Sequence, residues 1–98
     1  MPKRIIWSPS AENDLEKIAD YLFENWNAKT AIQFISLVDH LVELISKNPK
    51  LFPQINSELK VRKCVITKHN SIFYRLSEKQ IDILRIFDTR QNPEKLKL

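Results

Sequence analysis

Three consecutive strand-like runs near the C-terminus constrain the fold of this chain more than any other feature. They cover residues 61–67, 71–76 and 80–88 and are rich in β-branched, aromatic and other apolar side chains. The links between them, residues 68–70 and 77–79, have hairpin length, so the runs predict an antiparallel meander of three strands. One face of that meander must be covered by the rest of the chain.

The covering elements are predicted earlier in the chain. Residues 3–7 form a short apolar run that predicts a first strand beside the meander, and Ser8 and Pro9 suit the N-cap and first position of a helix. Apolar residues then recur at helical spacing over 9–26, ending with Leu22, Phe23 and Trp26, and again over 28–47, before Asn48-Pro49 ends the second helix. The residues expected in the core are Ile18, Leu22, Phe34, Val38 and Leu41.

These elements predict a single domain, residues 1–98, of the α+β class. It has an N-terminal strand and an α-helical hairpin packed on an antiparallel sheet that is led by the three-stranded C-terminal meander. The loop 50–57 is expected to fold Leu51, Phe52 and Ile55 back onto the core. Strict alternation in the last strand places Ile81, Ile83, Arg85 and Phe87 on one side and Asp82, Leu84, Ile86 and Asp88 on the other.

The composition excludes several classes of protein. The chain of 98 residues has no Gly, so the glycine-built phosphate cradles of Rossmann and Walker sites are excluded. The single cysteine, Cys64, cannot form an internal disulfide and suits a reducing compartment. No apolar run reaches the ~18 residues of a membrane span, and the N-terminus lacks the apolar core of a signal peptide. We therefore expect a cytoplasmic protein that needs no membrane, metal or cofactor.

Charge is distributed unevenly along the chain. Residues 1–49 contain five Lys or Arg against seven Asp or Glu, whereas residues 50–98 contain eleven against five. Because the basic half contains the meander, its sheet favours an anionic partner, either nucleic acid or an acidic peptide. A merely solubilising surface is the competing interpretation, since Lys and Arg are ordinary surface residues.

Two segments resemble a known family. Near the C-terminus, residues 72–75 (IFYR) are followed by residues 83–93 (ILRIFDTRQNP), and near the N-terminus Trp7-Ser8-Pro9 is followed by Ala11, Asp14, Leu15, Ile18 and Tyr21. Together they resemble the signatures of the RelE/ParE superfamily of toxins, and the small size and order of elements agree. The resemblance implies the toxin of a type II toxin–antitoxin system, a plasmid stabilisation protein that is neutralised by a cognate antitoxin.

The superfamily holds two activities. RelE-like members are ribosome-dependent endoribonucleases that cleave mRNA with basic side chains on the strands, whereas ParE-like members bind DNA gyrase. In this chain Cys64 and Ser71 stand where RelE-type nucleases tend to carry basic residues, and no Tyr or His follows Tyr74. The resemblance therefore favours growth arrest through a protein target such as gyrase, with cleavage of mRNA on the ribosome as the alternative.

The candidates for binding the target or the antitoxin are basic residues of the sheet half: Arg62, Lys63, Arg75, Arg85 and Arg90. For a nuclease, the catalytic candidates are His69, Arg75 and Arg90, because RNA cleavage needs proton transfer and stabilisation of the phosphorane charge. The competing interpretation is structural, with His69 solvated in a turn and the strand arginines paired with Asp82, Asp88 or Glu78.

Two further questions stay open. A basic α+β domain also fits an RNA-binding module that is not a toxin, with Phe73 and Tyr74 stacking on bases. Ile32, Leu37 and Leu44 lie off the main apolar stripe of the second helix and face either the first helix or a partner chain. Both a homodimer and a toxin–antitoxin hetero-oligomer fit that surface. The basic sheet half predicts an acidic, amphipathic antitoxin segment that binds as a helix or as an added strand.

Overall fold

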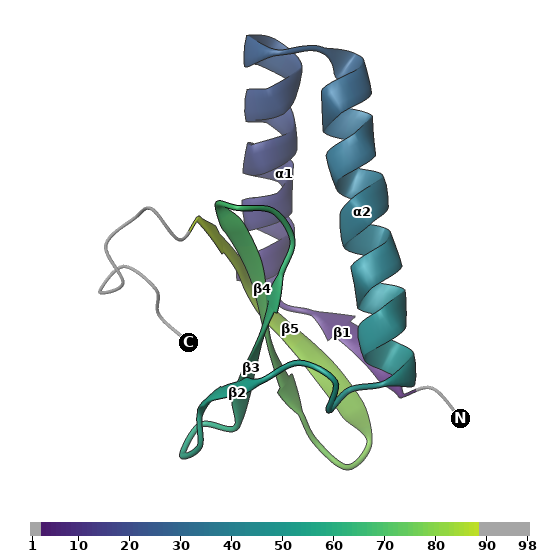
Figure 1. Cartoon of the computed structure of the whole chain (residues 1–98), viewed down its shortest axis with the longest axis vertical. Helices are drawn as coiled ribbons and strands as arrows, with labels where there is room; N and C mark the ends of the chain where they lie inside the picture. The colour runs from purple at the N-terminus through teal and green to yellow at the C-terminus, as the bar shows by residue number, and fades with distance from the viewer. Residues whose placement is uncertain (1–2, 89–98) are drawn as a thin grey trace.

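The computed structural model describes residues 3–88, which form two helices and one five-stranded sheet. The elements follow the order β1 (Arg4–Trp7), α1 (Pro9–Asn25), α2 (Ala28–Lys47), β2 (Gln54–Asn56), β3 (Val61–Val65), β4 (Asn70–Leu76) and β5 (Gln80–Asp88). Figure 1 shows α1 and α2 as a hairpin that packs on the sheet and extends well beyond it. The predicted α+β class, with a helical hairpin and a C-terminal meander, is confirmed.

The sheet is mixed, with the strand order β1-β5-β4-β3-β2. β3, β4 and β5 pair antiparallel to their neighbours, as the meander requires. β1 enters beside β5 and runs parallel to it, with Ile5 opposite Ile81. The prediction of an antiparallel sheet therefore holds for all strands except the N-terminal one.

Ser8 joins β1 to α1 and attaches both to β5. Its Oγ accepts a hydrogen bond from the Ala11 amide (3.0 Å) and donates one to the Leu84 carbonyl (2.8 Å). Its own amide donates to the Ile83 carbonyl (3.0 Å). Pro9 occupies the first turn of α1, where the absence of an amide proton removes no helical hydrogen bond. The predicted N-cap is confirmed, and it also sets the start of α1 against the edge of β5.

α2 also has the boundaries that the sequence predicts. Its N-cap is Asn27, whose Oδ1 accepts a hydrogen bond from the Thr30 amide (2.8 Å), and it ends at Lys47. Within residues 3–88, neither helix combines the length and the apolar character that a membrane span requires.

The main core lies between the hairpin and one face of the sheet. Its buried members are Ala11, Phe34, Val38, Ile45, Cys64, Ile66, Ile72, Tyr74, Ile81, Ile83 and Ile86. Of the predicted core residues, Phe34 and Val38 belong to this buried set, and Ile18, Leu22 and Leu41 pack against it while partly buried. The predicted core is confirmed.

The tip of the hairpin departs from the prediction. Phe23 and Trp26 continue the apolar spacing of α1, yet they are 61% and 69% exposed. Figure 1 shows the reason, because the sheet does not extend beneath the α1–α2 connection. Ile32, at the start of α2, is exposed in the same region. Helical periodicity identifies the inward face of a helix, but not how far along the helix its partner reaches.

The loop between α2 and β3 also departs from the prediction. Phe52 packs against the main core as expected, but Leu51 and Ile55 are exposed. The physical reason for Ile55 is that residues 54–56 form β2, an edge strand that pairs with β3 only on one side and carries an exposed pattern. The sequence analysis did not predict this strand.

A β-bulge in β5 overturns the predicted distribution of its side chains. Phe73 lies opposite Arg85 but Tyr74 lies opposite Ile83, so Leu84 is an extra residue in β5. Beyond this point the alternation is inverted. Ile86 therefore joins Ile81 and Ile83 in the main core, and Phe87 joins Val61 and Phe73 in a second cluster. The strict alternation that grouped Phe87 with Ile81 was wrong because it assumed an unbroken strand.

Candidate functional site

Arg62 lies on the helix-covered face of the sheet and holds the loop that follows α2. Its Nη1 donates to the Phe52 carbonyl (2.7 Å) and, at 3.4 Å, to the Lys50 carbonyl. Its register partner Tyr74 is fully buried and donates its hydroxyl to the Pro49 carbonyl (2.7 Å). The two side chains thus fix one short segment, residues 49–52, against the sheet.

Burial leaves Tyr74 and Cys64 poorly suited to chemistry. Loss of solvation raises the pKa of Tyr74 to about 12, although the positive charge of Arg62 opposes part of that rise. Loss of solvation likewise raises the pKa of the Cys64 thiol to about 11. Both groups therefore stay protonated at neutral pH, so Cys64 is a small core residue, in agreement with the sequence analysis, and not an activated nucleophile.

Lys63 and Arg75 lie on the other face of the sheet, which the hairpin does not cover. Lys63 is the register partner of Phe73, and Arg75 follows two residues after Phe73 on the same strand, so all three side chains share this face. Arg75 Nε donates to the Leu59 carbonyl (2.8 Å), and both basic residues keep part of their surface exposed. Of the predicted binding residues, these two are the pair that the sheet brings together.

Phe73 itself is almost completely buried. It packs edge-on against Phe87, with ring centroids 6.5 Å apart and an angle of 72° between the planes. Since Tyr74 is buried on the opposite face, neither ring presents a surface on which a base can stack. The RNA-binding module that stacks bases on Phe73 and Tyr74 is therefore excluded.

Arg85 is held by a carboxylate that the sequence analysis did not pair with it. Its Nε and Nη2 donate to the two oxygens of Asp14 at 2.7 and 3.0 Å, and the Ile86 amide donates to the same carboxylate at 3.1 Å. Those hydrogen bonds raise the pKa of Arg85, while its partial burial opposes the rise. Asp14 belongs to α1, so this contact ties the hairpin to β5 just beyond the end of β1.

His69 and Arg75 are not brought together. His69 lies in the β3–β4 turn, partly buried, and its amide donates to Thr67 Oγ1 (3.3 Å). Arg75 lies near the other end of β4, about 17 Å along the strand from its first residue, Asn70. A proton-transfer group and a charge stabiliser that far apart do not act on one phosphate. Arg90, the third catalytic candidate, lies outside the described residues.

Two features of residues 3–88 bear on ligands. No group of three or more His, Cys, Asp or Glu side chains in this range has an arrangement that suits a metal ion. A groove of about 500 Å³ lies between α1 and α2, lined by Trp7, Glu12, Leu15, Glu16, Ala19, Asp20, Ile35 and Asp39. We call it the interhelical groove. The sequence analysis missed it, although Glu12, Glu16 and Asp20 recur at the four-residue spacing that aligns side chains on one helix face.

A strand, a helical hairpin and a C-terminal meander in this order define a toxin of the RelE/ParE superfamily. Residues 5–93 match the family described as the ParE toxin of the type II toxin–antitoxin system parDE, and the chain belongs to this family.

Individual relatives agree with that assignment. Toxin ParE1 of Mycobacterium tuberculosis (strain CDC 1551 / Oshkosh) is 24% identical over 96 residues, which cover 97% of this chain and 98% of the relative. The structure of the chromosomal ParDE toxin–antitoxin system from P. aeruginosa superposes with a TM-score of 0.76 at 20% identity, covering 88% of this chain and 95% of that one. The YoeB–YefM complex from Staphylococcus aureus shares the fold with a TM-score of 0.62 at 19% identity, covering 89% and 97%.

Proposed function

We propose that this chain is a cytoplasmic toxin that arrests growth by binding a protein target, with DNA gyrase as the leading candidate, and that an antitoxin neutralises it. Membership of the ParE family supports the branch of the superfamily, and the resemblance of residues 83–93 to that branch supports the target. The antitoxin is supported by the relatives, since the P. aeruginosa and S. aureus structures are described as toxin–antitoxin systems.

The observation that carries the proposal is the engagement of the polar side chains of the sheet. Cleavage of RNA needs a base, an acid and a charge stabiliser within reach of one phosphate. In the described part of the chain, Arg62 and Tyr74 hold the loop after α2, Arg85 is paired with Asp14, and His69 lies at the far end of β4 from Arg75. These positions serve the fold and do not converge on one phosphate.

What the uncovered face does offer is a surface for a protein. Lys63 and Arg75 flank an apolar cluster that includes Phe73 and Phe87, and Val65 nearby is 59% exposed. Cations beside apolar area are typical of protein interfaces, in which arginine is enriched and the rim is polar. We assign this face to the target.

The test is to induce the chain without its antitoxin and to follow plasmid supercoiling and mRNA 5′ ends in the same culture. We expect arrest with altered supercoiling and no new 5′ ends within translated codons. An E58A variant, altered at an exposed turn residue, serves as the matched control and should remain toxic. Prompt cleavage within codons, abolished by His69→Ala or Arg90→Ala while supercoiling stays normal, would place the chain among the nucleases instead.

A further inference from the structure

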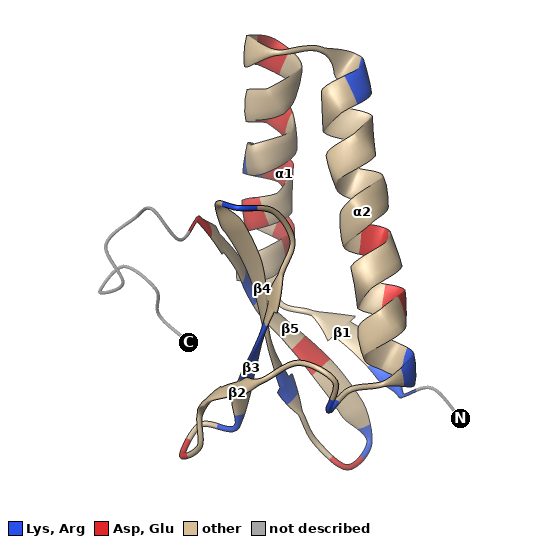
Figure 2. Cartoon of the chain, in the orientation of Figure 1, with Lys and Arg blue, Asp and Glu red and all other residues tan. Residues whose placement is uncertain are grey.

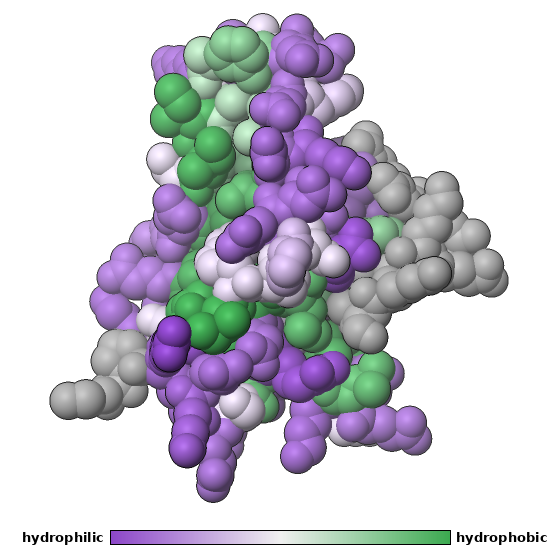
Figure 3. Space-filling view, turned by 180° about the vertical axis from the view of Figure 1, so that it is seen from behind, coloured by the Kyte–Doolittle hydropathy of each residue, from purple (hydrophilic) through white to green (hydrophobic). Residues whose placement is uncertain are grey.

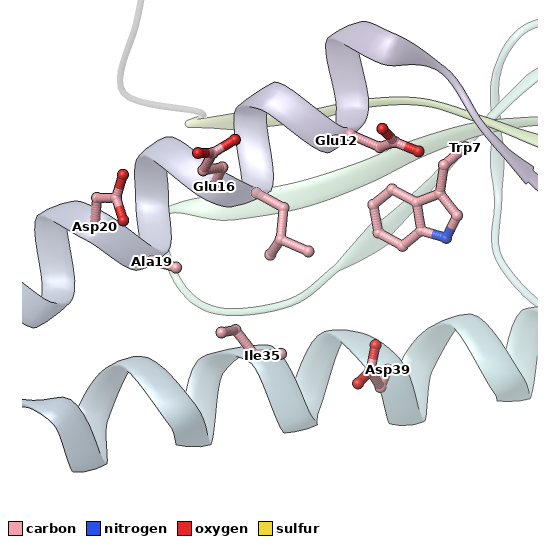
Figure 4. Close-up of a pocket in the computed structure, with 8 residues that line it drawn as sticks. Trp7, Glu12, Glu16, Ala19, Asp20, Ile35 and Asp39 are labelled. Carbon is pink, nitrogen blue, oxygen red and sulfur yellow. The ribbon is translucent and has the colours of Figure 1, made fainter.

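The interhelical groove has an apolar floor and acidic rims. Figure 4 shows Glu12, Glu16 and Asp20 on successive turns of α1 and Asp39 on α2 across from them, with Ala19 and Ile35 between the helices and Trp7 at one end. Leu15, Ala19 and Ile35 are only partly buried, so the floor remains accessible. Glu12 and Asp20 are about 12 Å apart along the helix, which is the length of roughly two helical turns.

The rim carboxylates have no cation of their own. All four are exposed, and within residues 3–88 the ion pairs are Lys47–Glu43 and Arg85–Asp14, neither of which involves the rim. Four carboxylates on two facing helices repel one another, so an incoming positive charge is favoured.

The groove also stands apart from the rest of the surface in charge. Figure 2 shows acidic residues concentrated along α1, whereas Lys and Arg gather around the sheet end of the molecule. The chain as a whole carries a formal net charge of +4. An acidic groove on a basic protein therefore distinguishes partners by the sign of their charge, since a cationic segment is drawn to the groove and repelled by the sheet end.

The shape of the groove identifies the kind of segment. Two antiparallel helices form the walls, and the lining includes a side chain of β1 but no backbone edge of a strand within the described residues. A third helix can place its apolar ridge between the two walls, whereas an added strand would find no backbone partner. Figure 3 shows hydrophobic residues gathered over the helical half among hydrophilic ones, which suits an amphipathic occupant.

We propose that the interhelical groove binds an amphipathic helix of the antitoxin whose apolar face is flanked by Lys or Arg. The proposal rests on the proposed function, because it takes the antitoxin as the source of the helix. It departs from the acidic antitoxin segment that the basic sheet half suggested. The two faces of the toxin then have separate roles, the sheet face toward the target and the groove toward the antitoxin.

Trp7 provides a probe inside the groove. The chain has two Trp residues, and Trp26 is 69% exposed at the hairpin tip, so a Trp26→Phe variant leaves Trp7 as the single reporter of the groove. Two synthetic peptides of about four helical turns, without Trp and with the same apolar face, carry either Lys or Glu at the flanking positions. The affinity of each peptide is measured from the Trp7 emission at low and at high salt.

We expect the Lys peptide to bind at least about tenfold more tightly than the Glu peptide at low salt, and its advantage to shrink as salt screens the rim. A Glu16→Lys/Asp39→Lys variant should abolish or invert the preference, and the milder Glu16→Gln/Asp39→Asn variant should reduce it. The matched control is Glu58→Lys/Glu78→Lys, which makes the same change of charge at exposed turns of the sheet end and should keep the preference within about threefold.

Three results would overturn the proposal: equal affinity for the two peptides, a preference that the groove variants leave intact, or binding without a change in Trp7 emission. A second experiment titrates each variant with the product of the short reading frame beside the toxin gene. Loss of that binding in the groove variants but not in the control supports the proposal, and unchanged binding contradicts it. The peptide measurement needs no toxicity, so a chain that fails to arrest growth refutes the proposed function and leaves this inference to its own result.

Discussion

Replacing Asp14 by alanine removes the acceptor on which three donors of β5 converge. In the wild-type protein the carboxylate accepts from Arg85 Nε at 2.7 Å, from Arg85 Nη2 at 3.0 Å and from the Ile86 amide at 3.1 Å. The two side chains retain only 13% and 23% of their exposure. The variant therefore leaves a guanidinium and an amide without this acceptor beside the core.

The magnitude follows from these contacts. Breaking a fully buried pair costs about 3 to 5 kcal/mol, whereas an exposed one is worth about 0.2 to 1 kcal/mol. Arg85 keeps some contact with solvent, so the value falls between these limits. We expect Asp14→Ala to lower the free energy of unfolding by about 2 to 3 kcal/mol, and Asp14→Asn, which keeps one acceptor oxygen, by about 1 to 2 kcal/mol.

Urea denaturation of the single variants Asp14→Ala and Arg85→Leu and of the double variant measures the coupling directly. We expect a coupling free energy of about 1 to 3 kcal/mol. The control is Glu43→Ala, which removes an exposed pair with Lys47 on α2 and should change stability by less than about 0.5 kcal/mol. A loss for Asp14→Ala no larger than that of the control, or a coupling near zero, would refute the reasoning.

Four further outcomes are expected. Phe34→Ala should lower the free energy of unfolding by about 3 to 5 kcal/mol in chemical denaturation because the ring is buried, and a loss below ~1 kcal/mol would contradict the packing of the hairpin. Ser8→Ala removes the helix cap and the bond to Leu84, so it should cost about 1 to 2 kcal/mol, a figure that thermal melts can check. The unfolded Cys64 thiol loses its proton near pH 9 but the folded one near pH 11, so stability is complete below pH 9 and falls by roughly 2 to 3 kcal/mol across this interval; Cys64→Ala should flatten that part of the curve. Lys63→Glu should weaken binding of the chain to purified gyrase by about tenfold and reduce its salt dependence, and an unchanged affinity would move the target to another face.

The helices and the meander could be predicted because their signals are local. Ser8-Pro9, Asn27 and Asn48-Pro49 set the ends of the helices through neighbouring backbone groups alone, and all three boundaries agree with the structure. Short polar links likewise determine which strands pair.

The contacts that shape the candidate site could not be predicted in the same way. Arg85 and Asp14 are separated by 71 residues, and the sequence analysis considered only the nearer carboxylates of the sheet half. The extra residue at Leu84 inverts the sides of Ile86 and Phe87, and no local pattern announces it. Both features depend on how α1 meets the edge of β5, which is a property of the assembled fold.

Lys63 and Arg75 were correctly chosen as a pair for a surface, but Arg62 and Arg85 were chosen with them only because they are basic and near in sequence. Their hydrogen bonds to Phe52 and Asp14 give them structural roles that composition does not reveal. Proximity in sequence identified the strands that carry the charges, and the pairing register decided which charges reach the surface.

The most direct test of the proposed activity uses purified components. The chain is titrated into a supercoiling reaction with DNA gyrase, relaxed plasmid and ATP, and in parallel into ribosomes that carry a defined mRNA. We predict inhibition of supercoiling as the chain approaches the concentration of gyrase, reversal by the antitoxin, and intact mRNA on the ribosomes. Unimpaired supercoiling together with cleavage of the ribosome-bound mRNA would contradict the account and assign the chain to RNA cleavage.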